Sequence, residues 1–347
     1  MVTDMKAKHM IIAAFAAMAL TQTSCEKVSP QGVLMAGTGV EDRVKMSEAY
    51  YRDYLMDSKN DIYVRPNEYG EYTYSFLVGA DSHITDDSGR MDEMFKIGLD
   101  NDDLLYCHLG DIADTKAEYY IRLDSLMQEA KARYVVKNYK LNDYGRWIHK
   151  YDPDDMADGY SYDEIKLPFF PVVGNHDLTH NGWALWSNIF HSSFYEFDVV
   201  CGTDQLGNTV RDHFIFLDTA SGTLGAHQID LIEQGLLDGE KNYRYTFIFS
   251  HTNIFLPQHF QFSSTFPREE AYFLLDQFEK WNASAIFCGH VHKWDDRFFN
   301  SVYYVTLDTM CERNNPQPGD YLVRINVRDG GGYEMERVHM NYTAPKK

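Results

Sequence analysis

The stretch "PVVGNHDL" occupies residues 171–178 and places three polar side chains directly after a short apolar run. Asn175, His176 and Asp177 follow Gly174 without interruption. An amide, an imidazole and a carboxylate in succession are more than a simple turn after a strand requires. The stretch therefore has two interpretations, a turn that ends a strand or part of a reactive site.

Polar residues also follow four other apolar stretches that we expect to be strands. The expected strands cover residues 71–81, 103–111, 167–175, 243–251 and 283–292. Because ligands bind at the carboxyl ends of strands in open α/β sheets, we expect the polar residues that follow these strands to converge. They are Asp81 and His83 in "GADSH", Asp111 in "LGD", Asn175 and His176 in "GNHD", His251 in "FSH", and His290 and His292 in "GHVH".

These side chains form a ligand set for metal ions that prefer oxygen and imidazole to thiolate. Leaving His176 aside, carboxylate and amide oxygens stand together with four imidazoles, more than one tetrahedral ion can use. The set suits two ions that share a carboxylate. Two ions about 3.5–4 Å apart can hold the attacking and the leaving oxygen of a displacement at phosphorus.

The five motifs, taken in order, resemble those of the calcineurin-like metallophosphoesterases. That family carries D-x-H, G-D-x-x-[D/N/E], G-N-H-[D/E], a lone His and G-H-x-H, and all five are found here between residues 81 and 292. The resemblance implies an α/β fold, a four-layer α/β/β/α sandwich of two mixed β-sheets flanked by helices. It also implies a dinuclear metal centre at the strand ends.

The resemblance assigns a role to each candidate residue. It implies catalysis by His176, as general acid or phosphate stabiliser, and by Asp114, which matches the carboxylate that orients this His in some members. The reaction implied is attack of a metal-activated water or hydroxide on phosphorus, without a phosphoenzyme. The implied ligands are Asp81, His83 and His292 at one ion, Asn175, His251 and His290 at the other, and Asp111 between them.

The resemblance implies two divalent or trivalent ions, Mn, Fe, Zn or Mg, and a small phosphorylated substrate, a mono- or a diester. Two departures from the family's motifs each argue against one branch of the family. "GDIADTK" lacks the Arg-Gly that follows the aspartates in Ser/Thr protein phosphatases, and position 114 is Asp where the purple, tyrosinate branch has Tyr. One alternative is a metal-dependent hydrolase of a phosphoanhydride or a phospholipid headgroup, which varies the substrate of the same chemistry. An alternative of another class is a surface-anchored binding module that keeps the fold without turnover.

The N-terminus has the pattern of an export signal. Lys6 and Lys8 precede an apolar run over residues 10–20, which is too short to span a bilayer. The segment 1–25 resembles a bacterial lipoprotein signal in which Cys25 is lipidated, although Gln22 stands where that signal usually has Leu. Ordinary cleavage nearby is the alternative. We expect an exported protein of the periplasm, the outer membrane or the cell surface, with a lipid anchor at Cys25 as its only membrane contact.

The rest of the chain reads as a tether over residues 26–42 and a single domain over 43–347, with an insertion at 115–167. We expect the insertion to begin with an amphipathic helix from Lys116 to about Asn138. Residues 131–150 carry six Lys or Arg and one Asp, and residues 151–164 carry six Asp or Glu. The split suits either a solvated insertion whose charges pair internally or a basic wall that steers an anionic substrate.

Composition excludes some functions. A formal net charge of −20 argues against nucleic acid as a general partner, because phosphate backbones require clustered Lys and Arg. A small phosphorylated substrate remains compatible, since bound metal reverses the local charge. The remaining cysteines show neither zinc-knuckle spacing nor a dense disulfide framework; they are Cys107, Cys201, Cys288 and Cys311. Oligomeric state has no signature in the sequence.

Overall fold

The computed structural model describes residues 39–50, 61–114, 116–130, 132–133, 139–141, 147–149, 167–239, 242–255 and 267–344. The predicted signal segment with Cys25 lies outside the described residues, as do most of the predicted tether and much of the 115–167 insertion. Among the helices of the described part, none has the length and apolarity needed to cross a bilayer.

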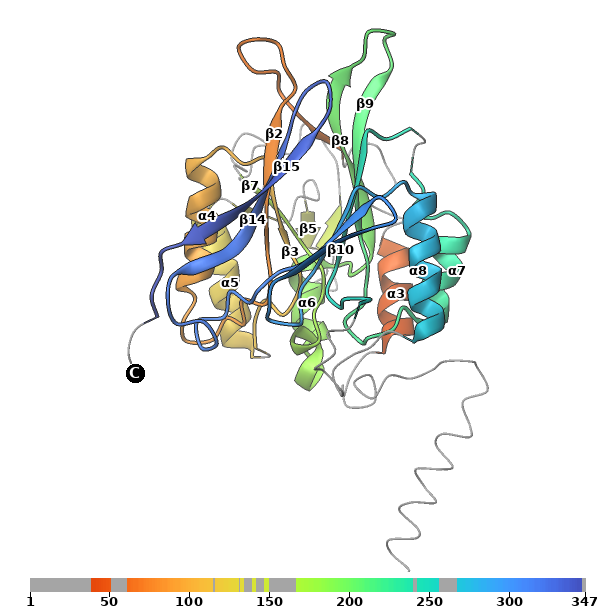
Figure 1. Ribbon diagram of the computed structural model, residues 1–347. Coiled ribbons are helices and arrows are strands. Elements are labelled where there is room, and N and C mark those ends of the chain that lie inside the picture. Colours follow the sequence, from red (N-terminus) through yellow and green to blue (C-terminus); the bar gives the residue numbers. More distant parts are fainter. Residues whose placement is uncertain are drawn as a thin grey trace, which may run out of the picture.

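Two mixed β-sheets form the centre of the molecule (Figure 1). The seven-stranded sheet has the order β1 (Ile62–Tyr63), β8 (Tyr195–Thr203), β9 (Thr209–Phe216), β10 (Tyr245–Ser250), β11 (Ala285–Cys288), β13 (Val302–Thr306), β12 (Asp295–Phe299). The six-stranded sheet has the order β15 (Tyr333–Met340), β14 (Gly319–Val327), β2 (Tyr74–Gly79), β3 (Leu105–His108), β7 (Leu167–Pro171), β4 (Ala132–Arg133). A separate pair joins β5 (Tyr139–Leu141) to β6 (Trp147–His149).

Helices cover the outer face of each sheet (Figure 1). Helices α4 (Gly89–Asp100) and α5 (Ala117–Glu129) lie beside the six-stranded sheet. Helices α3 (Val40–Tyr50), α7 (Gly225–Glu233) and α8 (Arg268–Lys280) lie beside the seven-stranded sheet. The predicted four-layer α/β/β/α sandwich of two mixed sheets is therefore confirmed.

Strand alternation builds two cores from one set of strands. On β9, Phe214 and Phe216 point between the sheets, and Ile215 points towards the helices with Leu217, the next residue of that face. Phe76 of β2 meets Phe214 across the sheets with ring centroids 5.1 Å apart. The aromatic layer buries large areas on both inner faces, so it holds the sheets together and fixes where their strand ends meet.

Two expected boundaries were wrong. Helix α5 ends at Glu129, well short of Asn138, because Ala132–Arg133 instead extends the six-stranded sheet as β4 beside β7. Helix α3 begins at Val40, inside the predicted tether of 26–42. Glu41 in its first turn accepts a hydrogen bond from the backbone N–H of His227 on α7, and this tertiary contact extends the helix.

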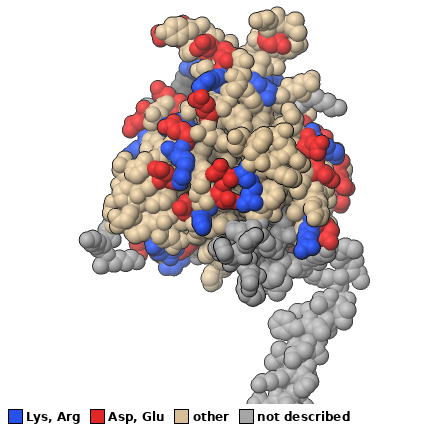
Figure 2. All heavy atoms as spheres, in the orientation of Figure 1, with Lys and Arg blue, Asp and Glu red and all other residues tan. Residues whose placement is uncertain are grey.

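Charge is mixed over the surface that Figure 2 shows. Acidic side chains are spread over that face, and basic side chains lie among them. Long-range attraction of an anion to this face has to come from a local positive site rather than from a broad basic surface.

Candidate metal centre

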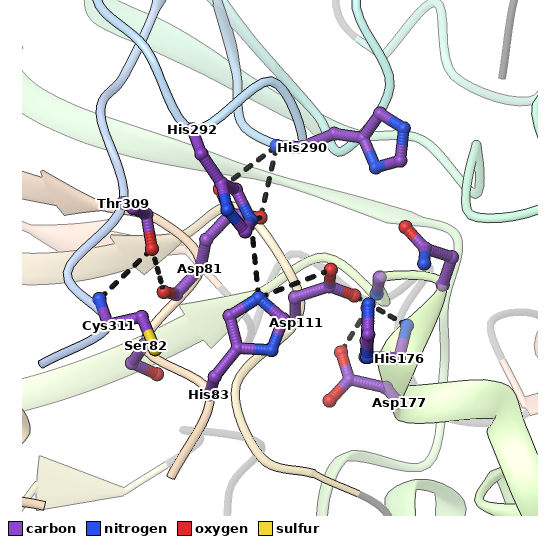
Figure 3. A network of polar contacts seen from close by, with 12 residues as sticks. Asp81, Ser82, His83, Asp111, His176, Asp177, His290, His292, Thr309 and Cys311 are labelled. Atoms are coloured by element: carbon purple, nitrogen blue, oxygen red, sulfur yellow. Dashed lines mark hydrogen bonds and ion pairs between the residues drawn. The ribbon is translucent and has the colours of Figure 1, made fainter. Parts of the chain in front are cut away.

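The predicted ligands lie after strands that run in parallel within each sheet. Strands β2, β3 and β7 are parallel neighbours in one sheet, and β10 and β11 are parallel neighbours in the other. Their carboxyl ends therefore open at a common edge. Figure 3 shows Asp81, His83 and His292 on one side of Asp111, with His176 and Asp177 on the other.

The first group of ligands surrounds one point beside Asp111. His83 Nε2 lies 3.2 Å from His292 Nε2 and 3.7 Å from Asp111 Oδ2. His292 Nε2 lies 3.3 Å from Asp81 Oδ1. Ligand atoms of these four side chains all lie within 4.8 Å of one another, which is compact enough for a single ion.

The second group lies on the other side of the same carboxylate. His251 Nε2 is 3.6 Å from Asp111 Oδ2, 2.9 Å from Asn175 Oδ1 and 3.1 Å from His290 Nδ1. Asp111 thus belongs to both groups. The structure brings all seven predicted metal ligands together, although they come from strands of two different sheets.

The contacts of His251 fit a ligand at this position. His251 Nδ1 lies 2.7 Å from the backbone oxygen of Leu109, so Nδ1 donates to that oxygen and Nε2 is the ring nitrogen turned towards the other donors. His251 Nε2 lies 2.9 Å from Asn175 Oδ1, which can only accept. A proton on Nε2 or a cation held by both atoms satisfies this pair, so the donor set fits a metal ion.

Electrostatics keep most of the set in ligand form. Burial alone would raise the pKa of Asp81 and of Asp111, but neighbouring histidines hold both below the usual value. Burial lowers the pKa of His290 to about 4, so its imidazole is neutral at pH 7. Burial also acts to lower the pKa of His83, but its bond to Asp114 and nearby carboxylates raise it to about 9. A cation would replace that His83 proton.

Two glycines allow the motif turns to touch. Gly110 has φ +87°, and a Cβ there would lie 2.7 Å from the backbone nitrogen of Gly174. A Cβ on Gly174 would lie 2.1 Å from the backbone nitrogen of Asp111 and 2.3 Å from its Oδ1. A larger residue at Gly174 would displace the shared carboxylate, and one at Gly110 would displace the Gly174 backbone and the His251 ring.

Most of the predicted ligands have a strained backbone. Five of the seven adopt left-handed φ values between +44° and +68°, although none is glycine: Asp81, His83, Asp111, His290 and His292. Each such residue costs about 1–3 kcal/mol, and strain of this kind clusters at functional sites. The packed strand ends hold these conformations against that cost.

His176 lies at the rim of the centre, where the structure leaves it exposed. Its ring meets that of His83 edge-on with centroids 4.7 Å apart, and its backbone N–H donates to Asp111 Oδ1 at 2.6 Å. The side chains packed against the inner edge of the ring desolvate it in part and so lower the pKa of His176, while the Asp111 carboxylate opposes that shift. Its side chain can therefore reach both the ligands and solvent, the position that a group acting on a substrate requires.

Asp114 contacts a different histidine from the one that the resemblance suggested. Its Oδ1 lies 3.3 Å from Nδ1 of His83, and its Oδ2 accepts a hydrogen bond from Arg313 Nη2 at 2.9 Å. An atom of Asp114 and one of His176 still lie within 4.8 Å of each other. The direct contact fixes the orientation of a predicted metal ligand, His83.

Asp177 ties two of the motifs together. Its Oδ2 accepts from the backbone N–H of Gly174 at 2.9 Å, and its Oδ1 accepts from that of Ile112 at 3.1 Å and from the Tyr120 hydroxyl at 3.0 Å. The "GNHD" turn is thereby bonded to the "GDIAD" loop, which carries Asp111 and Asp114.

Sequence reasoning missed the loop that follows β13. Thr309 Oγ1 donates to the backbone oxygen of Asp81 at 2.7 Å, and the side-chain amide of Asn314 lies 3.0 Å from His292 Nδ1. The signal that could have found this loop is "VTLDT", a strand followed by polar residues. Strand β13 is parallel to β11, so its carboxyl end opens at the same edge.

No family model matches this chain, and no curated protein matches it. Among solved structures, GAP50, the anchor in the inner membrane complex of Plasmodium, is 13% identical over 79% of this chain and 90% of its own, with a TM-score of 0.46. A dimetal phosphatase from Danio rerio is 13% identical over 76% of this chain and 98% of its own, with a TM-score of 0.44.

A third similar structure is a putative 5'-nucleotidase from Staphylococcus aureus, solved in complex with alpha-ketoglutarate. It is 14% identical, with a TM-score of 0.42, and the match covers 79% of this chain and 56% of that one. At such identities and TM-scores, these likenesses decide nothing about the chemistry of this chain. That chemistry has to be argued from the side chains described above.

Proposed function

We propose that this chain hydrolyses phosphate esters at a dinuclear metal centre and that its substrate is a small phosphorylated molecule, a mono- or a diester. The observation that carries the proposal is the position of Asp111. Its Oδ2 lies 3.7 Å from His83 Nε2 and 3.6 Å from His251 Nε2, between the two groups of donors. A carboxylate shared in this way is what two adjacent ions require.

The ligands divide between the two groups. Asp81, His83 and His292 would hold one ion, Asn175, His251 and His290 would hold the other, and Asp111 would contact both. Bound ions, Mn, Fe, Zn or Mg, would lower the pKa of a water and neutralise charge on the phosphoryl oxygens.

The protein's own groups supply the remaining functions. His176 at the exposed rim can give a proton or a hydrogen bond to an ester oxygen. Asp114 accepts from His83 Nδ1 and so keeps His83 Nε2 directed at the ion. Arg313 holds Asp114 from the other side. A nucleophilic side chain would not be required, because water activated by the bound ions would serve as the nucleophile.

The test is turnover of an aryl phosphomonoester and an aryl phosphodiester by metal-depleted protein reloaded with Mn²⁺, Zn²⁺, Mg²⁺ or Fe²⁺. We expect release of the aryl alcohol from at least one ester, dependent on the added ion. Full metal occupancy without turnover of either ester would contradict the hydrolase proposal. It would favour the alternative, a binding module that keeps the centre without catalysis.

We also propose export, with lipid attachment at Cys25. The support is the apolar run at 10–20 followed by Cys25. Cell fractionation after labelling with a radioactive fatty acid tests it. We expect label on the native chain in the membrane fraction and none on Cys25→Ser, and an unlabelled native chain would contradict lipid attachment.

A further inference from the structure

A second group of metal-ligand side chains lies outside the centre described above. Glu196 and Asp198 are two residues apart on β8, so they share one face of the seven-stranded sheet. His213 on β9 is the direct cross-strand partner of Asp198. One ligand atom from each of the three lies within 4.8 Å of the other two.

The group lies on the face of the seven-stranded sheet that points away from the aromatic layer between the two sheets. Phe197 and Phe214, the chain neighbours of the group, point between the sheets, so Glu196, Asp198 and His213 point to the helix-covered face. The three side chains project from neighbouring positions of a rigid sheet. Two of them lie at i and i+2 of one strand, and the third lies on the adjacent strand. That arrangement leaves a fourth position of a tetrahedral ion open.

Asp198 provides an independent sign that a ligand is missing. Its side chain is buried, with the residue 7% exposed, and its Oδ1 has no hydrogen-bond partner. Its Oδ2 accepts from Arg211 Nη1 at 3.2 Å, and Arg211 Nη1 also bonds Asp61 at 2.6 Å. A buried carboxylate oxygen without a partner is costly, and a cation is one group that can satisfy it.

A simple ion pair does not account for the whole group. His213 Nε2 bonds Glu196 Oε2. That pair leaves Asp198 Oδ1 without a hydrogen-bond partner. A cation held by Glu196, Asp198 and His213 would supply the missing partner.

The surrounding backbone closes over the group. Gly239, in the loop after α7, has φ +52°, and a Cβ there would lie 3.1 Å from Glu196 Oε2 and 2.1 Å from the Tyr243 hydroxyl. The Tyr243 ring stacks on His213 with centroids 4.2 Å apart. The histidine ring is thus held in one plane, as a ligand on a preorganised site should be.

We propose that Glu196, Asp198 and His213 form a separate metal site that takes Zn²⁺ or a similar first-row divalent cation and stabilises the β8–β9 pair. One nitrogen and two oxygen ligands suit such an ion better than Ca²⁺, which requires six to eight oxygens. This site shares no residue with the dinuclear centre, so it does not depend on the proposed function.

The experiment counts bound Zn²⁺ by mass spectrometry after metal-depleted full-length protein is reloaded with Zn²⁺ and gel-filtered. We expect Glu196→Gln and His213→Gln each to hold one equivalent less than the native chain. Their affinity for that ion should fall by more than about 100-fold, since loss even of a residue behind the ligands costs 10–100-fold. The matched control is His339→Gln, which removes the exposed His339–Asp320 pair, whose atoms lie 2.8 Å apart, and should lose no ion.

Thermal melting provides a second test of the site that can be interpreted even if a ligand variant folds poorly. In chelator, Asp198→Asn should melt at or above the native temperature, because it removes a buried carboxyl group that burial destabilises in its charged form and whose Oδ1 has no partner. With Zn²⁺ in excess, the native chain should gain several degrees more than Asp198→Asn. Equal zinc counts in the native chain and the ligand variants, or equal zinc-induced shifts, would overturn the proposal and leave an ion pair.

Discussion

Asp111 is the residue at which the two halves of the metal centre meet. Its two oxygens differ in their contacts: Oδ1 accepts from the His176 backbone N–H, and Oδ2 faces His83 and His251. The fixed Oδ1 leaves Oδ2 turned towards both groups of ligands. The carboxylate is fully buried, so nothing but an ion or these histidines can balance its charge.

Asp111→Asn should therefore empty both halves of the centre together. The amide keeps the shape but loses the charge that two cations share. We expect metal content to fall for both ions and turnover of aryl phosphates to fall by more than about 100-fold. Metal analysis and steady-state rates measure this, with exposed Asp320→Asn as the control. Loss of a single ion would show that Asp111 is not shared.

His176→Ala should separate metal binding from chemistry. No predicted ligand atom is removed, so both ions should remain, while kcat should fall by about 10²–10⁴-fold if the imidazole acts on the ester oxygen. Metal analysis beside kinetics provides the check, and His339→Ala, which alters an exposed histidine, is the control. An unchanged kcat would show that His176 takes no part in the mechanism. Loss of bound metal would show that His176 is a ligand.

At the scale of elements, the motifs bring their ligands together because each strand ends in a short turn. Strands β3 and β7 end at His108 and Pro171, and the turns that follow pass within contact distance of each other at Gly110 and Gly174. These turns place the strained ligand Asp111 beside Asn175, whose backbone is unstrained. Asp177 bonds both turns and so helps to hold the conformation of Asp111.

Gly110→Ala should abolish this contact, and the chain offers a close control. Gly110 has φ +87° and a Cβ there would meet Gly174, whereas Gly207 has φ +84° with nothing within 4 Å of its added Cβ. Both alanines suffer the left-handed penalty of about 1–2 kcal/mol. We expect metal analysis to show loss of bound metal in Gly110→Ala and none in Gly207→Ala. Equal metal content in both variants would show that the close approach is unnecessary.

At the scale of the whole molecule, the centre depends on the packing of two sheets. His251, His290 and His292 follow strands of the seven-stranded sheet, and Asp81, Asp111 and Asn175 follow strands of the other. No single sheet could assemble the set. The aromatic layer between the sheets therefore sets the distances at the strand ends.

Phe76→Ala should weaken both stability and the centre. Phe76 is fully buried and meets Phe214 and Phe247 of the opposite sheet at 5.1 and 5.2 Å. Its removal should cost about 3–5 kcal/mol in the free energy of unfolding by urea, with weaker metal retention. Phe298→Ala, at a residue 62% exposed, should cost about 0.5 kcal/mol or less. Equal losses would place the core elsewhere.

The sequence by itself determined the strands, their polar ends and the candidate ligands. These features are local, because a strand's apolar run and the residues directly after it are written consecutively in the chain, as in "PVVGNHDL". The four-layer sandwich followed from the resemblance in five such motifs. The hydrogen bond from the Gly174 N–H to Asp177 was also within reach of local reasoning, whereas the bond from the Ile112 N–H to Asp177 was not.

Only the tertiary structure decided which distant groups meet. It joined Ala132–Arg133 to β7 in place of a longer helix, brought Arg313 to Asp114, and set His213 opposite Asp198. None of these pairings has a signature in nearby residues, because strand register and loop contacts are fixed by burial of the whole core. The sequence specifies the candidate ligands, and the packing of the two sheets brings them together at one site.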